Sequence, residues 1–290
     1  MNISEAMKKH LLAFQRNEIT EYQIYRRLAK VTKDQSNRKV LNRIAVDELR
    51  HYEQLKAATG QTVAPDRFKI WKYVLIARVL GLTFGIKLME AGEADAQESY
   101  GRYENEFEPA ELMASDENEH EQELIGLIDE ERLHYTGSVV LGLNDALVEL
   151  TGALAGFTLA LQNTKLIALT GAITGIAAAL SMASSEYLST KAEGAEKHAG
   201  KASIYTGTAY IFTVLVLISP YLFLQNYFVC LAITLALGLL IIASFNYYIS
   251  VAKDLNFRRR FLEMAGLSLG VAAISFMVGF LLRKFTGIEI

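Results

Sequence analysis

Hydrophobic positions recur every three or four residues through the first 137 residues, with polar positions between them. This spacing is typical of amphipathic helices that pack into a bundle. We expect four such helices, at roughly 3–32, 36–58, 80–106 and 110–133. Gly60, Pro65 and Pro109 stand at the breaks between them.

From residue 138 onward the pattern changes to long apolar runs. We expect five transmembrane helices, at about 138–162, 165–188, 205–225, 227–250 and 262–284, each longer than the ~20 residues that cross a bilayer. The earlier run Trp71–Met89 is nearly as long, but it contains Lys72, Arg78 and Lys87. Three cations in one span would be costly in lipid, so we interpret this run as a buried helix of the soluble region.

Charge separates the same two regions and predicts their orientation. Residues 1–137 hold 24 of the 32 acidic and 19 of the 29 basic residues. Met1–Lys9 is polar and charged, so we expect no cleavable signal peptide and a cytoplasmic N-terminal region. With the N-terminus inside, the inner loops carry most cations of the membrane region, which places the C-terminus outside. The sequence therefore predicts an all-α protein, with a cytoplasmic four-helix bundle at 1–136 and a five-helix membrane domain at 137–290.

Each expected helix of the bundle carries carboxylates within its apolar stripe. These are Glu18 and Glu21 in the first helix, Glu48 with His51 in the second, Glu90 and Glu93 in the third, and Glu117 with His120 in the fourth. Burying an unpaired carboxylate costs several kcal/mol, so an apolar core needs compensation for these groups. Two metal ions supply it when two helices each give a Glu and the other two each give a Glu-x-x-His pair.

The Glu-x-x-His spacing alone is weak evidence, because 18 glutamates fall within residues 1–137. A third match, Glu131-x-x-His134, lies about 21 Å beyond the second along a helix, too far to join the same site. The alternative is a solvated acidic face. Two matches that fall in register with the apolar stripes favour the metal site. The single cysteine, Cys230, excludes a disulfide framework or a cysteine-held metal centre within one chain.

The stretches "RNEITEYQIYRRLA", "DELRHYEQL", "LMEAGEADAQESY" and "DENEHEQEL" resemble the rubrerythrin branch of the ferritin-like family, over about residues 5–133. The resemblance implies a di-iron centre with iron ligands at Glu18, Glu48, His51, Glu90, Glu93, Glu117 and His120. It selects Glu18 over Glu21 and leaves open which of Glu90 and Glu93 is the closer ligand. The chain lacks the cysteines of the rubredoxin module through which peroxide-reducing rubrerythrins receive electrons.

The ferritin-like plan requires a crossover after the second helix. Residues 61–79 must travel back along the bundle or carry the third helix to a second subunit. Either route favours a homodimer in which the apolar run 71–89 is buried.

The membrane region contains ionisable residues of its own, which are rare in spans and usually mark an ion path. Asp145 and Glu149 lie one turn apart in the first span, and Met182 and Glu186 lie one turn apart in the second. Asp145 lies about 12 Å from the cytoplasmic end and Met182 about 10 Å. Carboxylates with a thioether suit a transition-metal dication. The alternative is that Met182 only packs and Glu186 reaches the interface.

The motifs "LGLNDALVE", "LSMASSEYLS" and "YTGTAYI" resemble the vacuolar iron transporter family, over about residues 135–285. The resemblance implies that Asp145 and Met182 line a path for Fe²⁺ or Mn²⁺ in exchange for protons. Two features depart from the family. Ser189–Ile204 replaces a long acidic insert, and Thr174 stands where a membrane glutamate is expected. The fusion of both parts resembles the membrane-bound ferritins, which are linked to bacterial iron export.

We therefore expect a homodimer in the inner or plasma membrane that exports Fe²⁺, with Mn²⁺ as a further candidate ion. Protons are the expected counter-ion, carried on Asp145, Glu149 or Glu186. We expect membrane lipid around the spans and no nucleic-acid partner. One alternative is a membrane-anchored ferroxidase or peroxidase without transport. Another is a bundle that senses iron and gates the pore. Glu-x-x-His ligation does not separate these functions.

Overall fold

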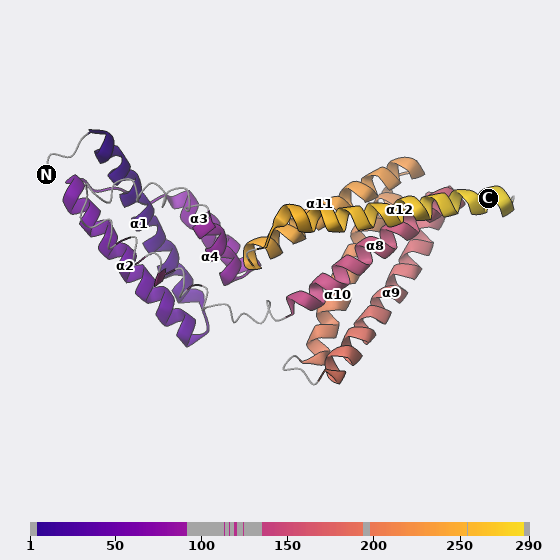
Figure 1. The fold of residues 1–290 in the computed structure, drawn as a ribbon, viewed down its shortest axis with the longest axis horizontal. Coiled ribbons are helices and arrows are strands. Elements are labelled where there is room, and N and C mark those ends of the chain that lie inside the picture. The colour runs from indigo at the N-terminus through magenta and orange to yellow at the C-terminus, as the bar shows by residue number, and fades with distance from the viewer. Residues whose placement is uncertain are drawn as a thin grey trace. The chain divides into compact units, whose positions relative to one another are not determined.

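The computed structural model describes residues 5–91, 113, 116, 119–120, 124, 135–193, 198–253 and 255–286. Every element formed by these residues is an α-helix, which agrees with the all-α prediction. The chain divides into two compact units, Met1–Glu130 and Glu131–Ile290 (Figure 1).

In the first unit, α1 (Glu5–Val31) and α2 (Gln35–Thr59) lie side by side, as two of the expected helices (Figure 1). Asp34 begins α2, because its side chain accepts a hydrogen bond from the backbone N–H of Asn37. Gly60 ends α2 with a φ of 66°, and its N–H donates to the Lys56 carbonyl. Both helix limits lie within one or two residues of the prediction.

The segment after α2 is fastened to α1 by polar contacts. The Gln15 amide donates to the Gln61 carbonyl at 2.8 Å, and the Asp66 backbone N–H donates to the Thr20 hydroxyl at 2.9 Å. Asp66 then caps α3 (Arg67–Leu80), which packs against α1. Over residues 61–80, therefore, the chain runs back along α1.

The apolar run 71–89 is not the single buried helix that the sequence suggested. Gly81, with a φ of 108°, separates α3 from α4 (Leu82–Ala91). Only one face of α3 is covered, so Tyr73 and Ala77 are buried while Trp71 is 59% exposed. The third expected helix begins at Leu82, and its part beyond residue 91 lies outside the described residues.

The fourth expected helix is described at five positions only. Met113, Asp116, Glu119, His120 and Leu124 are helical, and Met113, His120 and Leu124 are buried. The complete four-helix bundle therefore stays a prediction.

The second unit contains five helices that are long and apolar enough to cross a membrane, as the sequence predicted. They are α8 (Thr136–Leu161), α9 (Thr164–Ala192), α10 (Ala199–Phe223), α11 (Tyr227–Lys253) and α12 (Phe257–Thr286). These helices, together with their composition, indicate an integral membrane protein.

The central element of this unit is α8, which contacts each of the other four helices. Small residues permit the closest approaches. A Cβ added to Gly142 would lie 2.5 Å from the carbonyl oxygen of Thr206 on α10. A Cβ added to Gly279 on α12 would lie 2.5 Å from the carbonyl oxygen of Gly156. The acidic residues of α8 are therefore held on a helix whose neighbours fit closely around it.

We expect Gly142→Ala to destabilise the second unit by about 1–3 kcal/mol, because the new methyl group must displace the backbone of α10. Gly266→Ala on α12 is the matched control, since nothing lies within 4 Å of its added Cβ. Thermal unfolding of the detergent-solubilised protein, followed by circular dichroism, measures both variants. Equal melting temperatures would contradict the close α8–α10 contact.

Candidate metal sites

Three buried ligand groups meet between α1 and α2. Glu18 lies on α1, whereas Glu48 and His51 lie one turn apart on α2. Their ligand atoms all lie within 4.8 Å of one another. His51 Nδ1 is 3.5 Å from Glu18 Oε2 and 3.7 Å from Glu48 Oε2. Because the interrupted stripes of the two helices face each other, the two carboxylates and the imidazole could hold one metal ion.

A second imidazole approaches the same group from the described part of the fourth expected helix. His120 Nδ1 lies 3.3 Å from Glu48 Oε1, and the two histidine rings are 6.2 Å apart between centroids. Glu48 therefore directs one carboxylate oxygen toward each imidazole. Among the described residues, Glu48 Oε2 and His120 Nδ1 are buried and make no hydrogen bond. Once His120 loses its proton, both atoms offer buried lone pairs that fit a cation.

Asp116 and Asp47 contact the Nε2 atoms of the two imidazoles, on the side away from Glu48. Neither aspartate was among the predicted site residues. His51 Nε2 lies 3.0 Å from Asp116 Oδ2, and His120 Nε2 lies 3.3 Å from Asp47 Oδ2. Arg50 joins the two aspartates, at 3.0 Å from Asp47 and 2.7 Å from Asp116. Each aspartate thus orients the imidazole of the opposite helix with its Nδ1 toward the site. The signal was present in the sequence, since an aspartate precedes the glutamate in both "DELRH" and "DENEH".

The charges of this cluster are strongly coupled. Burial, together with the negative charge of Glu48, raises the pKa of Glu18 above the ordinary value. Burial opposes ionisation of Glu48 as well, but contacts with His120 and His51 outweigh it and lower the pKa of Glu48. Burial disfavours both imidazolium ions, yet the carboxylates raise the pKa of His51 to about 11 and raise that of His120. Without a metal ion, protonated imidazoles therefore balance the charge of Glu48.

The remaining expected bundle ligands cannot be placed. Glu90 belongs to α4, directly after the buried Met89, but its side chain lies outside what the structure describes. Glu93 and Glu117 also lie outside the described residues. Glu21, which the resemblance passed over, is buried but does not belong to the group formed by Glu18, Glu48 and His51.

In the membrane unit, Asp145 and Glu149 lie one turn apart on α8. Asp145 is half-buried, and Glu149 is exposed at the surface of the unit. The buried Tyr210 of α10 donates its hydroxyl hydrogen to Glu149 Oε2 at 2.9 Å. Asp145 is nine residues from the first residue of α8, which places it about 13 Å along the helix.

Met182 and Glu186 lie on α9, which packs against α8. Met182 packs against the apolar core of this unit, and it is ten residues from the end of α9, about 15 Å. Glu186 accepts a hydrogen bond from Ser138 of α8 at 2.5 Å. Among the described residues, no hydrogen bond or ion pair joins either carboxylate of α8 to Met182 or Glu186. The four side chains therefore lie on two neighbouring helices at comparable depths. They do not form one coordination group.

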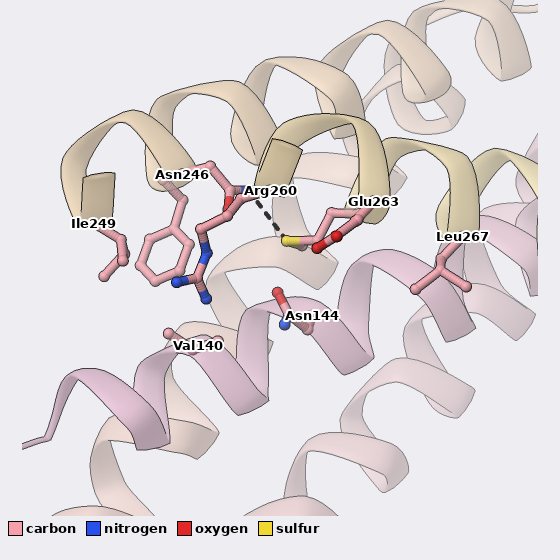
Figure 2. Close-up of a pocket in the computed structure, with 9 residues that line it drawn as sticks. Val140, Asn144, Asn246, Ile249, Arg260, Glu263 and Leu267 are labelled. Carbon is pink, nitrogen blue, oxygen red and sulfur yellow. Dashed lines mark hydrogen bonds between the residues drawn. The ribbon is translucent and has the colours of Figure 1, made fainter. Parts of the chain in front are cut away.

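A separate cavity of about 220 Å³ lies between α8, α11 and α12. Figure 2 shows Asn144 of α8 facing Arg260 and Glu263 of α12 across it. Asn246 of α11 donates to the Met264 sulfur there, at 3.1 Å. Consecutive residues of a helix point about 100° apart, so this cavity opens on a different face of α8 from Asp145. The sequence analysis did not select these polar groups, which lie outside the predicted path.

We expect metal binding to the bundle to release protons and to strengthen as pH rises. His51, whose pKa is raised to about 11, is protonated at neutral pH and must lose its proton to bind a metal. Each released proton gives an about tenfold rise in apparent affinity per pH unit. Anaerobic calorimetric titration of Fe²⁺ into the full chain, in two buffers of different protonation enthalpy, measures the release. His51→Asn should release fewer protons, and an affinity independent of pH between pH 6 and 8 would contradict the assignment.

Comparison with curated proteins gives no significant match for the chain. Residues 136–200 match the VIT family. This stretch comprises α8, α9 and the start of α10, so it includes both carboxylates of α8 as well as Met182 and Glu186. The match does not extend to the first unit, whose ferritin-like character remains a prediction. The second unit thus contains a VIT family domain at residues 136–200, and this domain indicates a membrane transporter of metal ions.

Proposed function

We propose that the protein exports Fe²⁺, or Mn²⁺, across the membrane in exchange for protons, and that the first unit is a cytoplasmic di-iron bundle. The observation that carries the transport proposal is the pair of carboxylates, Asp145 and Glu149, on the central helix of a VIT family domain. Two acids one turn apart in an apolar helix are costly unless positive charge compensates them, and the Tyr210 hydroxyl near Glu149 is neutral. A dication that passes this point would balance their charge.

The α9 residues complete the proposed path. Met182 lies at a depth comparable with that of Asp145, and its thioether favours a transition metal over Ca²⁺ or Mg²⁺. Glu186 lies nearer the end of α9 and would receive the ion first from the cytoplasmic side. Acids that bind a cation release protons, which provides the exchange. Thr174, in place of a family glutamate, leaves these three carboxylates as the proposed proton carriers.

The exposed position of Glu149 supports a homodimer. A carboxylate on the lipid-facing surface of a span is costly, so this face of α8 requires water or protein beside it. A second copy that covers the face would shield Asp145 and Glu149 from lipid. The proposed path then lies near the contact between the two copies.

The bundle fits a metal centre on chemical grounds. Glu18, Glu48 and His51 provide three ligand groups, and the position of Glu48 between two imidazoles suits a carboxylate that bridges two ions. In the proposed centre Glu117 would accompany His120, and Glu90 or Glu93 would supply the last carboxylate. Iron bound there would supply the Fe²⁺/Fe³⁺ couple, and dioxygen or a peroxide would accept the electron that Fe²⁺ loses. The residues themselves bind the ion, orient the imidazoles through Asp47 and Asp116, and accept or release the protons.

The second candidate function is a membrane-anchored ferroxidase or peroxidase without transport, favoured by the buried ligand cluster of the first unit. A further alternative is that the bundle senses iron and gates the pore. Transport depends on residues of the second unit, whereas ferroxidase or peroxidase activity depends on residues of the first. Variants in each unit therefore distinguish these functions.

We expect Asp145→Asn to abolish flux of Fe²⁺ into or out of proteoliposomes while iron loading of the bundle remains normal. The substitution keeps the size of the side chain and removes a charge that a dication needs in a low-dielectric site. Met182→Ala should weaken flux less, because a neutral thioether contributes selectivity more than charge balance. Glu263→Gln is the matched control, since this carboxylate lies on α12 and pairs with the exposed Arg259. A pH-sensitive dye inside the vesicles records proton movement.

Wild-type flux in Asp145→Asn would overturn the proposed path. If the wild type itself gave no flux in a working gradient, the anchored-enzyme function would replace transport. If Asp145→Asn lost flux but kept ferroxidase activity, transport and oxidation would belong to separate units.

We expect the double variant Glu48→Ala and Glu117→Ala to abolish iron binding by the bundle, because each substitution removes one carboxylate of a Glu-x-x-His pair. Metal analysis of the anaerobically loaded full chain measures the bound iron. Glu53→Ala is the matched control on α2, since Glu53 is exposed and pairs only with Lys56 among the described residues. Unchanged iron content in the double variant would end the di-iron assignment.

A further inference from the structure

Helix α3 presents an apolar stripe that stays exposed beside the described part of its unit. Phe68, Trp71, Leu75 and Val79 are 69%, 59%, 42% and 59% exposed. Their spacing of three, four and four residues places them along one line of the helix. The opposite face of α3, which includes Ile70, Tyr73, Val74 and Ala77, is buried in the core of the unit. One face of α3 therefore holds the helix in place, and the other is an apolar surface of unusual length for a soluble unit.

Cations border this stripe on both sides. Residues 67–80 contain Arg67, Lys69, Lys72 and Arg78 and no acidic residue. At about 100° per residue, Lys69 and Lys72 lie along one edge of the stripe, and Arg67 and Arg78 along the other. Residues 1–137 as a whole hold 24 acids against 19 bases, so the absence of acids from residues 67–80 distinguishes this helix. The exposed apolar stripe of α3 is thus bordered within its own helix by cations alone.

This pattern matches the chemistry of an anionic lipid surface. An interfacial helix inserts aromatic and aliphatic side chains below the headgroups, and long basic side chains at its edges reach the phosphates. Tryptophan favours the same depth. The five spans keep this chain at a membrane, so a bilayer surface is always available to the first unit.

A symmetric contact between the α3 helices of two copies fits the stripe less well. Two α3 helices that face each other would bring cations against cations, because residues 67–80 contain no acid to pair with them. Like charges that meet in a contact are destabilising. The charge around the stripe therefore favours an anionic lipid surface over a contact between two α3 helices.

We propose that α3 is an interfacial helix, which docks the first unit on an anionic membrane surface through Phe68, Trp71, Leu75 and Val79. The docking surface is independent of the transported ion and of the metal content of the bundle. It fastens the first unit to the bilayer at a second place, in addition to its chain connection to the spans.

Trp71 is the single tryptophan of the chain, so tryptophan emission of the full-length protein, excited apart from that of the tyrosines, reports on this stripe. The protein is reconstituted into vesicles of phosphatidylglycerol, or of phosphatidylcholine, that carry bromine near the headgroup end or near the methyl end of the acyl chains. In phosphatidylglycerol we expect blue-shifted emission and weak quenching by aqueous acrylamide. Shallow bromine should quench more than deep bromine. In phosphatidylcholine the quenching by bromine should fall.

A matched pair of double variants tests the role of charge. Lys72→Glu with Arg78→Glu should remove bromine quenching and restore acrylamide quenching. Arg27→Glu with Lys39→Glu makes the same charge change at exposed positions of α1 and α2 and should behave as the wild type. Helical circular dichroism and iron loading of the bundle verify that each variant is folded.

Two results would overturn the proposal. One is emission of Trp71 that acrylamide quenches fully in every vesicle, which would leave the stripe in water. The other is emission shielded from acrylamide but insensitive to bromine, with shielding that weakens as the protein-to-lipid ratio is lowered. That second result would identify another copy of the chain as the occupant.

Discussion

The cost of removing a carboxylate from water governs both units of this protein. In the first unit Glu48 is almost fully buried, and its charge is tolerated because an imidazole lies on each side of it. Those imidazoles are held in turn by aspartates at the edge of the site, and Arg50 links the aspartates. The chain of alternating charges brings α2 and the described part of the fourth helix together. It also presents two inward Nδ1 atoms to a common carboxylate, which is the arrangement a metal ion needs.

The same constraint is met differently in the membrane unit. Here the carboxylates have neutral partners, with Tyr210 donating to Glu149 and Ser138 donating to Glu186. One hydroxyl group orients a carboxylate but does not neutralise its charge. The negative charge of these acids therefore remains uncompensated unless a cation or a proton binds. This is the physical basis of the proposed exchange. The close packing of α8 against its neighbours, through residues such as Gly142, holds them in position.

Helix α3 obeys the opposite constraint, the cost of leaving apolar surface in water. It buries one apolar face against α1 and displays another, bordered by cations, where a soluble unit would carry polar residues. A lipid surface resolves this conflict without a further protein. The proposed docking would keep the first unit, and the metal centre proposed in it, beside a bilayer that its own chain crosses.

The sequence by itself determined the elements and the faces on which the candidate ligands lie. Hydrophobic periodicity predicted α1 and α2, and the length of apolar runs predicted five spans, because both signals are local. The stripe positions of Glu18, Glu48 and His51 followed from the same period. The tertiary structure alone decided what opposes each face. It divided the apolar run 71–89 at Gly81 and buried only one face of α3. It also placed Asp116 against His51 and Asp47 against His120, so that each aspartate contacts the histidine of the other helix. These outcomes depend on contacts between residues distant in the chain, and a periodic pattern specifies which side of a helix is apolar without specifying its neighbour.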